Sequence, residues 1–174
     1  MEIMDIQESI YAAKAMALFK EGYNCAQSVF LAFAEQYDME EETAARLSSS
    51  FGGGLGRMRE VCGAVSGMAM VAGILYGYDS PTDYEGKAEH YAGIQKLVNA
   101  FAEKNGSYIC RELLGLTQKN DSPIPERRTE EYYRKRPCAE LVGMAAAIME
   151  QYIAEHPVAL TDKGAGADKV AEAE

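Results

Sequence analysis

The chain has 174 residues, enough for one domain that buries a sizeable core without disulfides or metal. Its 27 acidic and 17 basic residues give a net charge of -10, which repels nucleic acid and anionic membrane surfaces, so we exclude nucleic acid as a partner. The N-terminal residues lack the basic and apolar regions of a signal peptide. We therefore expect a cytoplasmic protein with reduced thiols.

Apolar residues recur at helical spacing along the chain, and no period-two run of β-branched residues is present. The sequence therefore predicts an all-α, single-domain bundle of six or seven helices without a β-sheet over residues 1–157, and a disordered tail over 158–174. A glycine-rich loop, Phe51–Gly56, is interpreted as a hinge, and Thr117–Arg128 as an irregular connection. The expected helices are approximately Asp5–Lys20, Asn24–Tyr37, Glu40–Ser49, Arg59–Tyr76, Ser80–Asn105, Ser107–Leu114 and Pro137–Glu155.

The segment Val61–Tyr78 has no charged residue over eighteen positions, which just reaches the length of a membrane span. It contains four glycines but only one leucine and one isoleucine, so its transfer into lipid is weakly favourable. We interpret it as a core helix, expect no membrane insertion, and expect this helix to be the most buried of the bundle.

Each of the four cysteines stands near the predicted start of a helix: Cys25, Cys62, Cys110 and Cys138. The unpaired N–H groups and the positive dipole end favour a thiolate there. Basic residues lie nearby in sequence, at Arg57, Arg59, Arg111 and Arg134–Arg136. We therefore expect low thiol pKa values, with Cys138 among the most reactive. The alternative, that each cysteine is a small buried hydrophobe, stays open.

The second cysteine opens the element Cys62-Gly63-Ala64-Val65-Ser66-Gly67. With the other three in Asn24-Cys25-Ala26-Gln27, Cys110-Arg111-Glu112-Leu113 and Cys138-Ala139-Glu140-Leu141, it resembles the C_GCAxxG_C_C family over about Ala12–Ile153. The family is named for redox chemistry of its cysteines, and related domains occur in proteins with an iron–sulfur centre. The resemblance implies redox activity but assigns no reaction. The chain has no C-x-x-C-H motif, so the sequence does not indicate covalently bound haem.

Three functions follow from these observations. In the first, Cys25, Cys62, Cys110 and Cys138 are redox thiols that converge and bind an iron–sulfur cluster or another soft metal for electron transfer to an unknown redox partner. Gly63 and Gly67, one helical turn apart, would let the cluster or a neighbouring helix approach. This hypothesis allows a crystallised form that has lost its cofactor. It also allows the protein to form a homo-oligomer.

The second function is a metal-free dithiol/disulfide oxidoreductase that uses the same thiols. The third is a structural zinc protein or interaction module without turnover. Zinc sites use short loops between ligands, so the gaps of 37, 48 and 28 positions between successive cysteines argue against zinc. The two histidines, His90 and His156, are far apart in sequence and are interpreted as surface residues.

Overall fold

The computed structural model describes residues 4–117 and 122–158, and within them it contains eight α-helices and no strand. The predicted all-α class is therefore confirmed. Most of the predicted tail 158–174 lies outside the described residues. The helices are α1 (Ile10–Glu21), α2 (Cys25–Ala32), α3 (Glu41–Ser48), α4 (Gly63–Tyr76), α5 (Tyr84–Asn105), α6 (Cys110–Leu113), α7 (Glu130–Lys135) and α8 (Cys138–Glu155), with short 3₁₀ turns η1 (Ala34–Gln36) and η2 (Ser49–Phe51).

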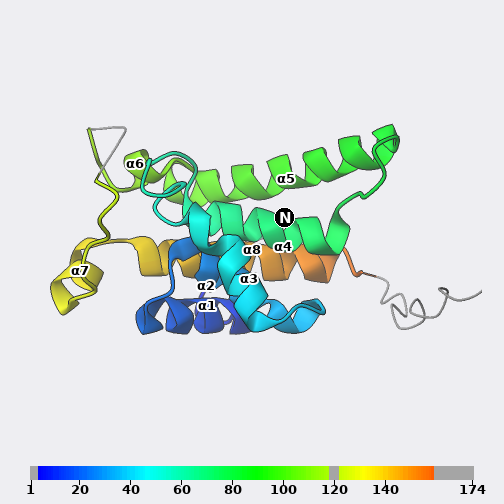
Figure 1. Cartoon of the computed structure of the whole chain (residues 1–174). Helices are drawn as coiled ribbons and strands as arrows, with labels where there is room; N and C mark the ends of the chain where they lie inside the picture. The colour runs from blue at the N-terminus through cyan, green and yellow to red at the C-terminus, as the bar shows by residue number, and fades with distance from the viewer. Residues whose placement is uncertain (1–3, 118–121, 159–174) are drawn as a thin grey trace, which may run out of the picture.

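Helices α1, α2, α4 and α8 pack around one hydrophobic core, and α5 covers α4 and α8 from the other side (Figure 1). Helices α4 and α8 both begin at the left-hand end of Figure 1, where α5 ends and leads into α6. No helix in the described part of the chain is long and apolar enough to span a membrane. The largest fully buried side chains include Phe19, Phe30, Phe33, Phe101, Met68, Ile148 and Met149.

The ends of several helices follow from local capping. Gly22 ends α1 with a left-handed φ of 117°, and Asn24 caps α2 in a reciprocal capping box with Gln27. Helix α1 begins later than predicted because Ser9 accepts a hydrogen bond from the Ala12 N–H. Helix α5 likewise begins at Tyr84, where the Asp83 side chain caps it, rather than at Ser80–Pro81.

Two short elements differ from the sequence prediction. Helix α7 was not expected, and Thr129 caps it by accepting a hydrogen bond from the Tyr132 N–H. Helix α6 begins at Cys110, whereas Ser107 was expected to cap a longer helix. The residues before α6 form an isolated antiparallel β-bridge instead, between Val61 and Ile109.

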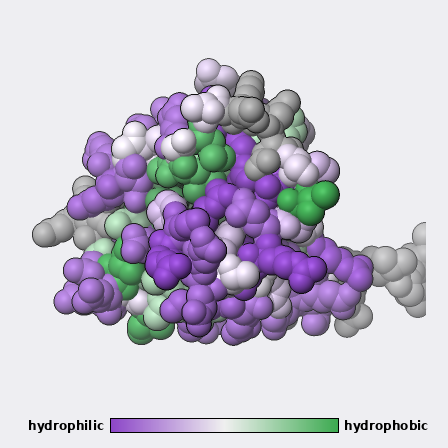
Figure 2. Space-filling model, turned by 90° about the vertical axis from the view of Figure 1, so that its left-hand side faces the viewer, coloured by the Kyte–Doolittle hydropathy of each residue, from purple (hydrophilic) through white to green (hydrophobic). Residues whose placement is uncertain are grey.

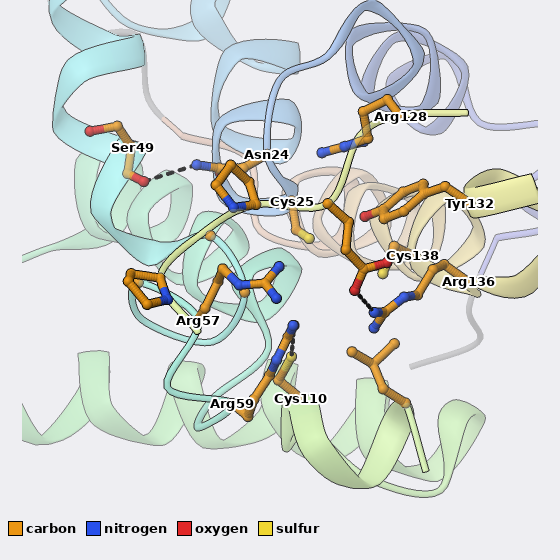
Figure 3. A pocket seen from close by; sticks show the side chains of 17 residues that line it. Asn24, Cys25, Ser49, Arg57, Arg59, Cys110, Arg128, Tyr132, Arg136 and Cys138 are labelled. Atoms are coloured by element: carbon orange, nitrogen blue, oxygen red, sulfur yellow. Dashed lines mark hydrogen bonds and ion pairs between the residues drawn. The ribbon is translucent and has the colours of Figure 1, made fainter. Parts of the chain in front are cut away.

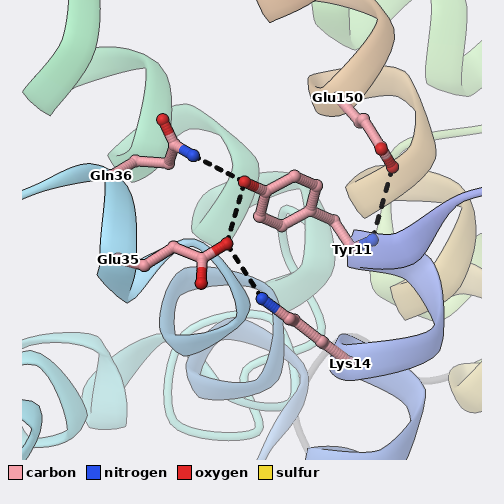
Figure 4. A network of polar contacts seen from close by, with 5 residues as sticks. All are labelled: Tyr11, Lys14, Glu35, Gln36 and Glu150. Atoms are coloured by element: carbon pink, nitrogen blue, oxygen red, sulfur yellow. Dashed lines mark hydrogen bonds and ion pairs between the residues drawn. The ribbon is translucent and has the colours of Figure 1, made fainter.

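A polar network fastens α1 to its neighbours (Figure 4). The Tyr11 hydroxyl donates to Glu35 and accepts from Gln36 of η1, and Lys14 pairs with Glu35 at 2.9 Å. Glu150 of α8 accepts from the Tyr11 backbone N–H at 3.3 Å. Helix α1 is thereby tied to η1 and α8.

Helix α4 is buried along its first part, but Gly73 and Ile74 are exposed in its last turns. The expectation that it is the most buried helix is wrong, because α2 is covered by α1, α3, α4 and α8 and leaves only Cys25 and Gln27 short of full burial. Gly67 explains how closely α2 and α4 pack. A Cβ atom there would lie 2.6 Å from the Ala26 carbonyl oxygen of α2.

Two glycines of α4 form a matched pair for testing this packing. We expect Gly67→Ala to lower the free energy of unfolding by about 1–3 kcal/mol, because the added methyl must push α2 away. Gly73→Ala should be neutral or stabilising by up to about 1 kcal/mol, because its Cβ would meet nothing within 4 Å and alanine favours helix. Urea denaturation followed by circular dichroism measures both, and equal effects would contradict the close approach.

Candidate functional site: a cavity lined by four cysteines

All four cysteines line one small cavity, together with Gly63 at the start of α4. Cys25, Cys110 and Cys138 are the first residues of α2, α6 and α8, and Cys62 is the N-cap of α4. All four are free thiols. The fold therefore brings four helix starts from distant parts of the sequence to one place.

Gly63 allows two of these helix starts to meet. A Cβ atom at Gly63 would lie 2.9 Å from the Phe51 carbonyl oxygen and 3.1 Å from the Cys25 Cβ atom. Gly67, one turn later, faces Ala26 and does not line the cavity. Both glycines therefore allow helix α2 to pack closely on α4. Only Gly63 lines the cavity, so the prediction that a cofactor approaches a glycine concerns Gly63.

The β-bridge between Val61 and Ile109 positions the second pair of cysteines. The Cys62 N–H donates to the Tyr108 carbonyl at 2.8 Å, and the Cys110 N–H donates to the Glu60 carbonyl at 2.6 Å. Cys62 and Cys110 each directly follow a residue of the bridge, and both line the same cavity. The bridge therefore holds these two cysteines near each other.

The loop before α4 is held by its own backbone rather than being an open hinge. Residues Gly53 to Arg57 all have φ between 56° and 69°, and the Gly56 N–H donates to the Ser50 carbonyl at 2.8 Å. Consecutive left-handed residues are costly for any residue with a side chain. Gly54 is needed for a second reason: a Cβ atom there would lie 2.8 Å from the Cys110 Cβ atom. The loop therefore packs directly on the cysteine site.

Cys25 is the acidic thiol of the site. The neighbouring Cys138 thiol, as a hydrogen-bond partner, lowers the pKa of Cys25 to about 7, although burial opposes this shift. The Gly53 N–H and the positive charge of Arg128 also lower the pKa of Cys25. Cys25 is also the one cysteine of the four that is not fully buried.

The other three thiols have raised pKa values. Burial raises the pKa of Cys62 to about 12, and it raises that of Cys110 although the Arg59 Nη1 atom lies 3.9 Å from its sulfur. The hydrogen bond to Cys25, with burial, raises the pKa of Cys138. The expectations of four acidic thiols and of a reactive Cys138 are therefore wrong. Desolvation outweighs the helix dipole, and one thiolate disfavours a second beside it.

A second, larger cavity of about 260 Å³ opens beside the first and shares Cys25, Cys110 and Cys138 with it (Figure 3). The described residues of its wall include four arginines and one glutamate. This end of the molecule, which faces the viewer in Figure 2, is largely hydrophilic with a few apolar patches. The charged lining residues are Arg57, Arg59, Arg128, Arg136 and Glu126.

Other contacts fix these arginine side chains in place. The Arg57 Nε atom donates to the Ser122 carbonyl at 2.6 Å, and Arg136 pairs with Glu126. Arg128 donates to the carbonyls of Phe19 and Tyr23, and its guanidinium group lies 4.1 Å from the centroid of the Phe19 ring. The positive wall is therefore a built part of the fold.

Sequence reasoning found only part of this wall. It named Arg57, Arg59 and Arg136, but Arg134 and Lys135 do not line the cavity. Arg111 instead binds the Glu60 carboxylate at 3.1 Å. Arg128, which sequence reasoning missed, lies next to another arginine in a connection of no clear pattern. The adjacent pair Arg127-Arg128 is the only feature of the sequence that pointed to a basic residue of the site there.

Within residues 4–117 and 122–158, no group of three or more His, Cys, Asp or Glu side chains is arranged to hold a metal ion. The two histidines lie outside the cysteine cavity. His90 lines a separate hollow beside Tyr78, and the His156 ring stacks on Tyr152 at 4.1 Å. The chemistry of the site rests on sulfur.

These features define an all-α protein with a thiol cluster at the converging ends of its helices. The model of a family described as "Putative redox-active protein (C_GCAxxG_C_C)" matches residues 23–152, and the chain belongs to this family. No curated protein matches it, and no solved structure does. The family resemblance noted from the sequence is confirmed.

The pKa of Cys25 tests the interaction with Cys138. We expect iodoacetamide to alkylate Cys25 with a rate that rises through pH 7, since the thiolate is the reacting form. Cys138→Ala should move this midpoint toward the free-cysteine pKa of about 8.5, because the donor is lost. Cys138→Ser, which keeps a hydroxyl donor, should move it less. Peptide mapping by mass spectrometry identifies the alkylated residue, and an unchanged midpoint in Cys138→Ala would refute this assignment.

Proposed function

We propose that the protein is a dithiol/disulfide oxidoreductase in which Cys25 attacks and Cys138 resolves. The observation that supports this best is the pair itself: an acidic thiol, on the one cysteine residue that is not fully buried, beside a thiol that donates to it. A nucleophilic thiolate with a pKa near ambient pH and an adjacent resolving thiol are what disulfide exchange requires.

The reaction balances with a disulfide substrate as the oxidant. The Cys25 thiolate attacks one sulfur of the substrate, forms a mixed disulfide and releases the other half as a thiolate. Cys138 then loses its proton to that thiolate and attacks the Cys25 sulfur, which releases the second half. The substrate gains two electrons and the Cys138 proton and leaves as one thiol and one thiolate, which takes its proton from water, while Cys25 and Cys138 become a disulfide.

Each step suits the position of its residue. Cys25 lines both cavities, so a substrate in the larger cavity reaches it. Cys138 is buried, and its high pKa keeps it protonated until the mixed disulfide has consumed the Cys25 charge. Loss of that thiolate removes the main cause that raises the pKa of Cys138, so the resolving thiol becomes more acidic when it is needed.

The second candidate is an iron–sulfur cluster or another soft metal, and the shared cavity of four cysteines favours it. The donor type fits such a group, but the described side chains form no metal-holding arrangement. Anaerobic purification, followed by an absorption spectrum and iron and sulfide analysis, separates the candidates. A brown protein with stoichiometric iron and sulfide would replace the dithiol proposal.

Trapping experiments test the two cysteine roles. We expect Cys25→Ser to abolish reduction of a small disulfide, because the attacking thiolate is absent. Cys138→Ser should accumulate the mixed disulfide on Cys25, because nothing resolves it. Both products are read by mass spectrometry without reducing agent.

Cys62→Ala is the control, since the proposed steps do not use this thiol and it does not line the larger cavity. It should retain disulfide exchange within about a factor of three and form the Cys25–Cys138 bond. A disulfide that joins another pair in the wild-type protein would contradict the assignment.

A further inference from the structure

The arginine-lined cavity has a charge opposite to that of the chain as a whole. The net charge is -10, yet the described residues of the wall include four guanidinium groups and one carboxylate, that of Glu126. Even with Cys25 as a thiolate, these described residues carry an excess of positive charge. Local fields of this kind concentrate ligands of the opposite sign by about 10–10³-fold.

Two of the arginines occupy backbone positions that arginine rarely adopts. Arg57 and Arg59 have φ values of 68° and 62°, and Arg59 is only 4% exposed. Left-handed φ costs about 1–2 kcal/mol per residue with a side chain, and strained residues of this kind gather at functional sites. Both arginines line the cavity that contains the thiols, and the Arg59 Nη1 atom lies 3.9 Å from the Cys110 sulfur.

The cavity also places these charges next to the reacting sulfur. In Figure 3 the side chains of Arg57, Arg59 and Arg136 point toward the space in front of Cys25, Cys110 and Cys138. A guanidinium group binds carboxylates through two parallel hydrogen bonds, which fixes orientation as well as charge.

The size of the cavity restricts what enters it. Its volume of about 260 Å³ lies just below the range of small-molecule sites, about 300–1,000 Å³. Pro123, Pro125 and Tyr132 complete the wall around the arginines. A small molecule suits this space better than a folded protein surface does.

We propose that the substrate is a small disulfide that carries carboxylate groups, bound by the arginine wall with its sulfur–sulfur bond against Cys25. This inference rests on the proposed function and names the substrate class of the same site. The exchange itself is the one already balanced above, with the two halves of the substrate released as carboxylate-bearing thiols.

Three disulfides of equal spacing and different charge test the proposal: dithiodipropionate, which is anionic, bis(hydroxyethyl) disulfide, which is neutral, and cystamine, which is cationic. Each rate with the wild-type protein is divided by the rate of the same disulfide with mercaptoethanol, which removes intrinsic reactivity. We expect the normalised rate to be about tenfold or more higher for the anionic disulfide than for the neutral one, and lowest for cystamine.

Charge variants locate the effect. Arg57→Gln and Arg136→Gln should each lower the anionic-to-neutral ratio by about threefold or more. The ratio is insensitive to a change in the reactivity of Cys25 itself. Arg134→Gln is the matched control, because this exposed arginine is close in sequence, loses the same charge and does not line the cavity. Circular dichroism verifies that each variant keeps its helical fold.

The outcomes separate the two proposals. Equal normalised rates for all three disulfides, or equal effects of Arg134→Gln and both cavity variants, would overturn the substrate class and leave the disulfide chemistry standing. Absence of exchange with all three disulfides would overturn the proposed function itself.

Discussion

The close approach of helices α2 and α4 is the contact on which the arrangement of the site depends. At Gly67 the added methyl of any other residue would meet the Ala26 carbonyl, and at Gly63 it would meet Cys25. Only with both glycines does the start of α2 lie against the start of α4. Cys25 and Cys62 lie at these two helix starts. The β-bridge brings Cys110 to them, and Cys138 reaches the same place as the first residue of α8.

Effects that lower and effects that raise the thiol pKa compete within the cluster. Helix starts and arginines stabilise a thiolate, whereas burial and a neighbouring thiolate destabilise it. At Cys25 the hydrogen bond from Cys138, the Gly53 N–H and the charge of Arg128 together outweigh the opposing effect of burial. The result is a division of roles among four chemically identical residues, set by their surroundings.

Much of this architecture could be predicted from the sequence, because helical periodicity and capping residues are local signals. Helix α5 ends at Asn105 as predicted, Asn24 caps α2 at its predicted start, and α1 ends at Glu21, one residue beyond its predicted end. The placement of all four cysteines at helix starts followed from the same signals. The pKa order of the thiols did not, because burial is set by contacts between elements that are distant in sequence. Arg128 was missed for the same reason, since only the fold carries it to the cavity.

The glycine loop also limits how this protein can vary in length. It is fixed at two internal points, with Gly52 against Asn24 and Gly54 against Cys110, so one inserted or deleted residue would shift the loop out of register with both. The turn that joins α4 to α5 lies at the opposite end of the bundle, and Asp79 and Pro81 in it are exposed. We therefore expect insertions to be tolerated at that turn and not in the glycine loop.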